Sequence, residues 1–328
     1  MRPHRHQRGA ALLLAMLMVT LVAVLASASL WQQWRAIEIE RAQRVRLQAG
    51  WLLTGALDWT RLILREDGRA NQIAGQPDHL GEPWALPLQE ARLSRFLALD
   101  ANERGDELLE AFFSGEVIDL QSRLNFGNLV RQSGSGNELK AEISPVDLEA
   151  FRRLYARLGL PVGELEAAAQ AWRQTLQQAL TDPRPSATAL IPQRFAQLRW
   201  LGISSASLAV LEPHATLLPG RAPLNLNTAS AEALEAAIPD IDATQARALV
   251  LARTRQPLVT LAEARRALFG DRVVEGNPLS EIYHDVRSRH FEIRGRLRLD
   301  DITIEERSVV QRSNQGVKVL WRERFSRS

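Results

Sequence analysis

The N-terminal stretch constrains this chain most, because it divides sharply into a basic part and an apolar part. Arg2, Arg5 and Arg8 precede Gly9, and no side chain from Ala10 to Trp34 carries a charge. A helix over this run is long enough to cross the roughly 30 Å hydrocarbon core of a bilayer. Since arginines flank only one end, we expect the N-terminus in the cytoplasm and the rest of the chain across the membrane.

Three interpretations of this stretch compete. A cleaved secretory signal would use Ala26-Ser27-Ala28 as its small-residue site, but the apolar run is long for such a signal. A plain signal anchor needs only the basic flank and the apolar helix. A prepilin-type leader ends in glycine and leaves the apolar helix on the mature protein, as Gly9 followed by Ala10 would. The residues alone leave the anchor and the prepilin leader open.

The apolar helix is predicted to continue well beyond the membrane. One apolar stripe recurs at helical spacing and is formed by Val45, Ala49, Leu52, Leu53, Ala56, Trp59 and Ile63. We expect the helix to end at Glu66-Asp67-Gly68, after which glycines and prolines predict irregular chain to about residue 88, with Trp84 packed onto the domain surface. A helix whose first half is exposed and whose second half packs against a globular body is unusual for a simple anchor.

The middle of the chain changes from a strand to a series of helices. Val117, Ile118 and Leu120 indicate a strand, and Asp119 begins a polar turn. After the glycine-rich break at 133–137, helices with recognisable caps are predicted at 145–158, 163–180 and 195–201, from Thr228 or Ser230 to 237, from 242 to about 253, and from 260 onward. No strand is expected between about 145 and 270, so this part is predicted to be all-helical.

The C-terminal part returns to the two-residue period of strands. Phe291, Ile293, Leu297 and Leu299 alternate with charged residues, and apolar runs near 302–310 and 317–321 follow, the last after a turn at 314–316. This pattern predicts a two- or three-stranded antiparallel meander with one solvated, arginine-rich face.

The sequence offers no catalytic constellation. It contains no cysteine. His79, His214, His284 and His290 are scattered without metal-ligand spacing, and no phosphate-binding or dinucleotide loop is present. We therefore expect a protein that is not an enzyme and that needs no cofactor.

Residues 224–253 resemble a helix-hairpin-helix unit, a module that binds DNA in some proteins. In DNA-binding members a glycine-rich hairpin lets backbone N–H groups approach a phosphate. Here the hairpin after Pro239 reads Asp240-Ile241-Asp242, with two carboxylates and no glycine. The net charge of +3 adds little support for a nucleic acid partner. We expect structural use of the module and no nucleic acid.

Taken together, these features resemble the minor pseudopilin K family of bacterial type II secretion systems. The resemblance runs from residue 8 to about 290 and is carried by Arg8 to Leu13, Asp119 to Asn125 with Asn128-Leu129, Phe151 to Leu154 and Pro223 to Ala229. It implies an α+β fold: a pilin-like domain, in which a long N-terminal helix packs on a small antiparallel sheet, with a large all-α insertion containing the helix-hairpin-helix-like (SAM-like) unit.

The resemblance also implies a division of the chain and a set of structural residues. The expected parts are a cleaved leader at 1–9, a membrane half of the helix at 10–34, a first pseudopilin part at 35–130, an inserted helical domain at 131–285 and completing strands at 286–328. The membrane and filament helix would use Ala10, Leu12, Leu13, Leu14, Leu17, Val19, Leu21 and Val24. The family motifs carry over to Asp119, Asn125, Asn128, Asn225, Asn227 and Thr228 as structural residues.

One departure from ordinary pilins is informative. In most pilin-like proteins the fifth mature residue is a glutamate that meets the N-terminal ammonium of the previously added subunit. Counting from Ala10, that position is Leu14. A buried carboxylate is costly unless it is paired, and a subunit without it has no such charge to offer a neighbour. Leu14 therefore fits the first place in a filament.

A second departure concerns calcium, which the resemblance allows in an acidic stretch of the helical insertion. The corresponding residues, 180–191, contain only one acid, Asp182. Calcium takes several oxygen ligands, so we assign none here.

The resemblance implies a structural role at the tip of the pseudopilus. A prepilin peptidase would cut after Gly9 and methylate Ala10, and the chain would be an inner-membrane protein with a periplasmic domain. Its partners would be the I and J minor pseudopilins and the inner-membrane assembly platform, in support of the export of folded proteins across the outer membrane. The alternative is a membrane-anchored helix-hairpin-helix DNA-binding protein of an uptake system. A periplasmic enzyme on a signal anchor is a weaker third interpretation.

Overall fold

The computed structural model describes residues 8–92, 111–134, 139–181, 190–270, 272, 278–299 and 302–327. Most of the basic leader, most of the glycine-rich break and most of the stretch examined for calcium lie outside these residues. The sequence leaves open the secondary structure of two short apolar segments, 93–99 and 107–113, and of these only residues 111–113 are described.

The described chain forms a very long helix, a small mixed body and a terminal meander. Its α-helices are α1 (Arg8–Ala74), α3 (Pro145–Leu158), α4 (Val162–Thr181), α5 (Ser205–Leu211), α6 (Ala231–Ala237), α7 (Ala243–Arg255) and α8 (Leu261–Phe269). Its 3-10 helices are η1 (Pro83–Ala85), η2 (Leu120–Ser122), η3 (Phe126–Leu129) and η5 (Phe195–Leu201). The strands are β1 (Leu88–Arg92), β2 (Phe112–Asp119), β3 (Leu124–Asn125), β4 (Val130–Ser133), β5 (Lys140–Ile143), β6 (Ala215–Thr216), β7 (Leu224–Asn225), β8 (His284–Asp285), β9 (His290–Leu299), β10 (Ile302–Ser313) and β11 (Gly316–Arg327).

The main sheet has five antiparallel strands in the order β1-β2-β9-β10-β11. The predicted C-terminal meander is confirmed as β9, β10 and β11, with the turn at Asn314 and Gln315 just before Gly316. The strand predicted near Val117 is confirmed as β2 and pairs with β9. Distant parts of the sequence therefore build one sheet, and the helical segments lie between its second and third strands.

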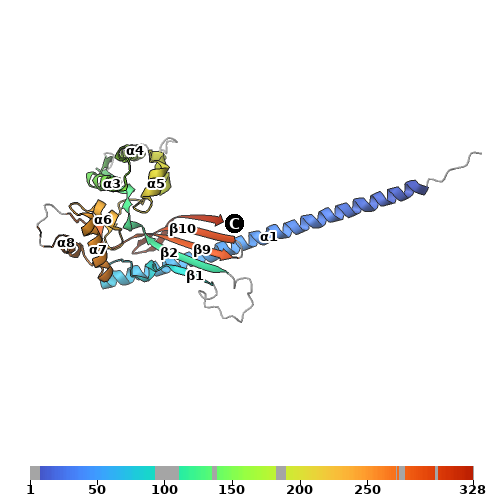
Figure 1. The fold of residues 1–328 in the computed structure, drawn as a ribbon, viewed down its shortest axis with the longest axis horizontal. Helices are drawn as coiled ribbons and strands as arrows, with labels where there is room; N and C mark the ends of the chain where they lie inside the picture. Colours follow the sequence, from blue (N-terminus) through green and yellow to red (C-terminus); the bar gives the residue numbers. More distant parts are fainter. Residues whose placement is uncertain are drawn as a thin grey trace, which may run out of the picture.

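The second half of α1 packs along this sheet, while its first half projects away from the body (Figure 1). The packed face uses Ala49, Leu53 and Ala56 against Phe113 and other apolar residues of the sheet. Farther along the helix, a second cluster joins it to the sheet and to η1 through Leu57, Leu64, Trp84, Phe291, Ile293, Val310 and Val317. The predicted stripe is thus confirmed in its main part, but Trp59 is exposed.

The predicted end of α1 at Gly68 is wrong, because the helix continues to Ala74. A Cβ at Gly68 would lie 2.8 Å from Cδ of Arg312, so this glycine permits a close approach by the sheet. Gly75, with φ of +67°, follows the last helical residue in the left-handed region that favours glycine. Trp84, predicted to pack the irregular stretch onto the domain, is buried edge-on against Phe291.

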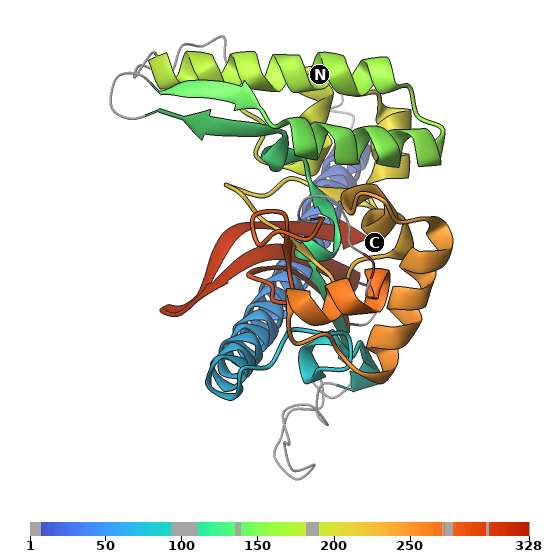
Figure 2. The same cartoon turned by 90° about the vertical axis from the view of Figure 1, so that its left-hand side faces the viewer.

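We use the name head for α3 to α8 together with the hairpin β4–β5. The head lies at the end of the sheet opposite the free half of α1 (Figures 1 and 2). Its core extends from Leu124 to Val286 and is separate from the core between α1 and the sheet. Ser144, Ser230, Asp242 and Thr260 occupy the N-cap positions of α3, α6, α7 and α8.

The prediction of an all-helical middle segment needs correction. The hairpin β4–β5 precedes α3, and β6 and β7 lie between helices and pair in parallel with β3 and β8. These two-residue strands carry too few residues to show a periodic pattern. The segment predicted to be helical at 195–201 is a 3-10 helix.

The sheet face away from α1 is charged, as predicted. Its arginines are matched by carboxylates: Arg294 lies 3.1 Å from Glu116, and Arg298 lies 2.6 Å from Glu90. Such exposed pairs contribute little to stability and describe a solvated surface.

Candidate functional site

The free half of α1 is the most conspicuous functional feature of the molecule. Its residues are exposed from Ala10 to Arg41. An 18-residue window of this helix has a mean hydropathy of 2.6 and none of it is buried, so the helix is long and apolar enough to cross a membrane. An apolar surface of this size is not left in water.

The structure places the predicted processing and filament residues on this free half. Gly9 and Ala10 follow Arg8, the first residue of α1. The predicted filament residues share one property, which is exposure: Ala10, Leu12, Leu13, Leu14, Leu17, Val19, Leu21 and Val24. Leu14 is therefore available to a neighbouring molecule, and it brings no charge to that contact.

The predicted structural residues meet in a second, buried place. Asp119 ends β2 at the edge of the head, and its carboxylate accepts four hydrogen bonds. Oδ1 accepts from the backbone N–H of Gln121 at 2.8 Å. Oδ2 accepts from the hydroxyls of Thr228 at 2.5 Å and Ser288 at 2.6 Å, and from Nδ2 of Asn225 at 3.2 Å. Burial raises the pKa of Asp119 to about 6, and the bonds from Ser288 and Thr228 oppose that rise.

Asn225 connects this carboxylate to two further segments. Its Nδ2 lies 2.9 Å from the Ser288 hydroxyl oxygen and 3.3 Å from the carbonyl of Asp78. Its side-chain oxygen accepts from the backbone N–H of Asn227. Asn225 and Asp119 therefore join β2, β7, the loop after α1 and the chain before β9. We call Asp119, Asn225, Thr228 and Ser288 the joint.

The other predicted asparagines bind loops within the head. Asn125 accepts from the N–H groups of Gly127 and Leu218 and donates to Asn128 at 3.0 Å. Asn128 forms both an N–H···O and an O···H–N bond with the backbone of Ala222.

Asn227 forms the same two-bond pattern with the backbone of Leu258. Beside it, the buried guanidinium of Arg253 donates to the carbonyls of Leu226 and Ala229, and burial lowers its pKa to about 10. These amides act as substitutes for sheet pairing, because each satisfies backbone groups that no strand reaches.

Sequence reasoning missed several residues that complete the joint and its surroundings. Asp78, Ser288 and Arg312 are each far in sequence from Asp119 and stand in stretches without a recognisable pattern. Arg312, on β10, contacts Asp67 at 3.1 Å and Asp78 at 2.5 Å, and donates to the carbonyl of Ser288. Only the folded chain brings these groups together.

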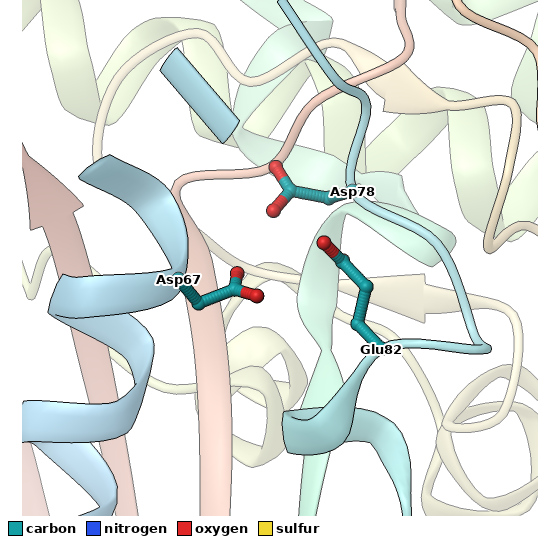
Figure 3. Close-up of side chains that lie close together, drawn as sticks. All are labelled: Asp67, Asp78 and Glu82. Carbon is teal, nitrogen blue, oxygen red and sulfur yellow. The ribbon is translucent and has the colours of Figure 1, made fainter. Parts of the chain in front are cut away.

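Asp67, Asp78 and Glu82 form a compact acidic cluster next to the joint, with carboxylates that point toward one another (Figure 3). One oxygen from each lies within 4.8 Å of the others. Burial and the nearby Glu82 raise the pKa of Asp67 to about 7, although Arg312 acts in the opposite direction.

The acidic cluster has the residue types of a cation site, but the chain supplies its own donors. Glu82 accepts from Nδ2 of Asn71 at 2.6 Å and from the indole N–H of Trp84 at 2.8 Å. The guanidinium of Arg312 forms ion pairs with the carboxylates of Asp67 and Asp78. We therefore describe an ion-pair cluster and assign no metal ligands.

The hairpin between α6 and α7 disfavours the DNA interpretation. Asp240 is the one non-glycine residue with positive φ among the described residues, so an aspartate takes the conformation that favours glycine. Asp242 accepts from the N–H groups of Thr244 and Gln245, both at 2.8 Å. The first N–H groups of α7 are thus satisfied by a carboxylate of the chain, where a phosphate would bind.

These features define a class of protein: an α+β protein whose long N-terminal helix is apolar enough in its first half to cross a membrane, packs on an antiparallel sheet in its second half and carries a helix-rich head. Comparison with known proteins finds similarity to one particular family. The family model described as Type II secretion system (T2SS), protein K matches residues 224–280. Over these residues the chain is similar to the type II secretion system protein K family.

Two relatives and one solved structure are similar to this chain over most of its length. The type II secretion system protein K of Pseudomonas aeruginosa is 28% identical over 343 residues, which cover 97% of this chain and 93% of that protein. The protein of the same description from Pectobacterium carotovorum subsp. carotovorum is 26% identical, with 97% and 96% covered. A chain in the crystal structure of the GspK-GspI-GspJ complex from enterotoxigenic Escherichia coli shares the fold, with a TM-score of 0.61, 18% identity, and 87% of this chain and 98% of that chain covered.

Proposed function

We propose that this protein is a structural minor pseudopilin that caps the tip of the periplasmic pseudopilus and supports the export of folded proteins. The observation that carries the proposal is the two-part helix α1, which is exposed and apolar in its first half and packed on the sheet in its second. A helix of this kind can exchange a lipid environment for a bundle of similar helices without any change in the folded body.

Leu14 gives the proposed position within the filament. A subunit with an apolar residue here offers no carboxylate to the N-terminal ammonium of a neighbour, so no charge pair is broken when one side of the helix has no neighbour. The placement of the head supports the same position. It lies at the end of the sheet farthest from the free half of α1, where it widens the molecule beyond the helix and sheet (Figure 1).

The proposed partners are the I and J minor pseudopilins, the prepilin peptidase and the inner-membrane assembly platform. The I and J assignment rests on the related chain, which was solved in a GspK-GspI-GspJ complex. The N-terminus would lie in the cytoplasm, and the sheet and head in the periplasm. The protein would work without catalysis and without a required cofactor, because its buried polar groups serve to join its own segments.

The mass of the mature protein tests the proposal. In cells with an active prepilin peptidase, we expect the wild-type chain to lose residues 1–9 and to carry a methyl group on Ala10. The Gly9→Ala variant is expected to keep its leader, while the control Gly163→Ala, in α4, matures normally. A wild-type chain of unchanged mass under these conditions would rule out the proposed processing.

A further inference from the structure

A cleft of about 310 Å³ lies where the head meets the charged face of the sheet. One wall comes from η5 and α5 of the head, and the other comes from β9, β10 and β11. Apolar side chains from both walls line it, among them Phe195, Leu208, Val309 and Trp321. Its size and its mainly apolar walls with a few polar groups are those of a small-molecule pocket.

Four arginines and three glutamates also line this cleft, and most of these charges are paired. Arg194 lies 3.2 Å from Glu323 and so connects the start of η5 to β11. Arg307, on β10, lies 3.3 Å from Glu292 and 3.7 Å from Glu212, which follows α5. The carboxylates of the cleft are therefore already bound to arginines of the chain.

Arg123 is the exception, because it lines the cleft without a partner for its side chain. It is half-buried, and its guanidinium forms no hydrogen bond or ion pair with any residue that the structure describes. Burial lowers the pKa of Arg123, although Glu292 acts in the opposite direction. Glu292 itself is bound to Arg294 and Arg307. Since buried polar groups are normally satisfied, the free N–H donors of Arg123 indicate a missing acceptor.

The charge of the cleft limits which acceptor can enter. Arg199, exposed on η5, is a second lining arginine without a carboxylate within ion-pair distance in the described part of the chain. Four arginines against three glutamates leave one positive charge in the lining. A single negative charge balances it, whereas a second one would be repelled by the nearby glutamates. The cleft therefore favours a carboxylate over a phosphate dianion.

We propose that this cleft binds a monocarboxylate joined to an apolar body, of the kind found at the C-terminus of a peptide that ends in an aromatic residue or in a small aromatic acid. The planar guanidinium of Arg123 matches the two oxygens of a carboxylate with two parallel N–H groups. The apolar body would lie between the two walls, in contact with Leu208 of the head and Trp321 of the sheet.

Calorimetric titration of the detergent-solubilised full chain tests this site. We expect N-acetylphenylalanine to bind at least tenfold more tightly than its uncharged amide, and also at least tenfold more tightly than inorganic phosphate. Arg123→Gln should weaken binding of the acid at least tenfold. The matched control is Arg265→Gln, which removes an exposed arginine of α8 outside the cleft and should bind the acid as the wild type does.

A second acid distinguishes the two sources of the carboxylate. Phenylpropanoate has the same aromatic ring and carboxylate but no peptide group. If N-acetylphenylalanine binds at least tenfold more tightly than phenylpropanoate, the site recognises a peptide C-terminus. Equal binding of the two acids assigns a small aromatic acid, and either result supports the carboxylate site.

Thermal unfolding without ligand separates a binding role of Arg123 from a structural one. Because Arg123→Gln removes a half-buried charge and breaks no hydrogen bond of its side chain, its Tm should not fall below that of the wild type. A lower Tm would show that Arg123 serves the fold and would overturn the site. Equal binding of the acid and its amide, equal binding of phosphate, or unchanged binding by Arg123→Gln would overturn it as well.

Discussion

Replacing Asp119 with asparagine tests whether the joint holds the head to the sheet. The change preserves size and leaves one oxygen for the N–H of Gln121. It places an NH₂ group where Oδ2 accepted from Thr228, Ser288 and Asn225. The hydroxyls of Thr228 and Ser288 can rotate and accept a hydrogen bond from this NH₂ group. The NH₂ group of Asn225 can only donate, so it loses its acceptor at position 119.

The magnitude follows from the donors that asparagine leaves without their charged acceptor. The pKa of about 6 for Asp119 already includes the hydrogen bonds from Ser288 and Thr228, so it adds no separate contribution. A buried donor left without a partner costs about 1–3 kcal/mol. Because the amide of Asn225 and two hydroxyls lose the charged acceptor together, we expect the Asp119→Asn variant to be less stable at pH 7 by about 3 kcal/mol, at the upper end of that range.

Thermal unfolding of the detergent-solubilised chain, followed by tryptophan fluorescence, measures this difference. A loss of about 3 kcal/mol corresponds to a Tm lower by roughly 6–12 °C for a body of this size. The exposed Asp58, paired only locally with Arg61, provides the control, and Asp58→Asn should change Tm little. If Asp119→Asn melted within about 1 °C of the wild type, the joint would not be what holds the head.

Two further predictions concern the packed half of α1. Since the folded pKa of Asp67 is raised to about 7, the folded state keeps a proton that the unfolded chain releases above about pH 4, and stability falls as pH rises toward 7. Between pH 5 and pH 8 the wild type should therefore lose up to about 3 kcal/mol more of its free energy of unfolding than Asp67→Asn, as measured by urea titrations. An equal loss in the two proteins would contradict the assigned pKa. Leu53→Ala should cost about 3–5 kcal/mol, and exposed Leu47→Ala close to none, in the same titrations.

The comparison of prediction and structure shows where local patterns suffice. The stripe on α1, the caps of the head helices and the alternation in β9 to β11 were readable because each repeats at the period of its own element. Gly68 was misleading because the pattern that signals a helix end also marks a close approach from another element. Here that approach comes from Arg312, more than two hundred residues away in the chain.

The joint could be predicted only in part. Asp119, Asn225 and Thr228 stood out in the sequence as family motifs, but nothing local showed that they meet. Their partners Ser288 and Asp78 carried no signal at all, since a single serine or aspartate in a loop is common. Two-residue strands such as β6 and β7 were missed for the same reason, because no period can be read from two residues.

The sequence by itself determined the membrane-length apolar helix, its continuation as the spine of a folded domain, and the absence of a charge at Leu14. These are properties of consecutive residues, and hydrophobicity and helical period express them directly. Only the tertiary structure decided which face of that helix the sheet covers. It also decided that scattered polar residues close into one joint, because hydrogen bonds between distant segments depend on the positions of both partners.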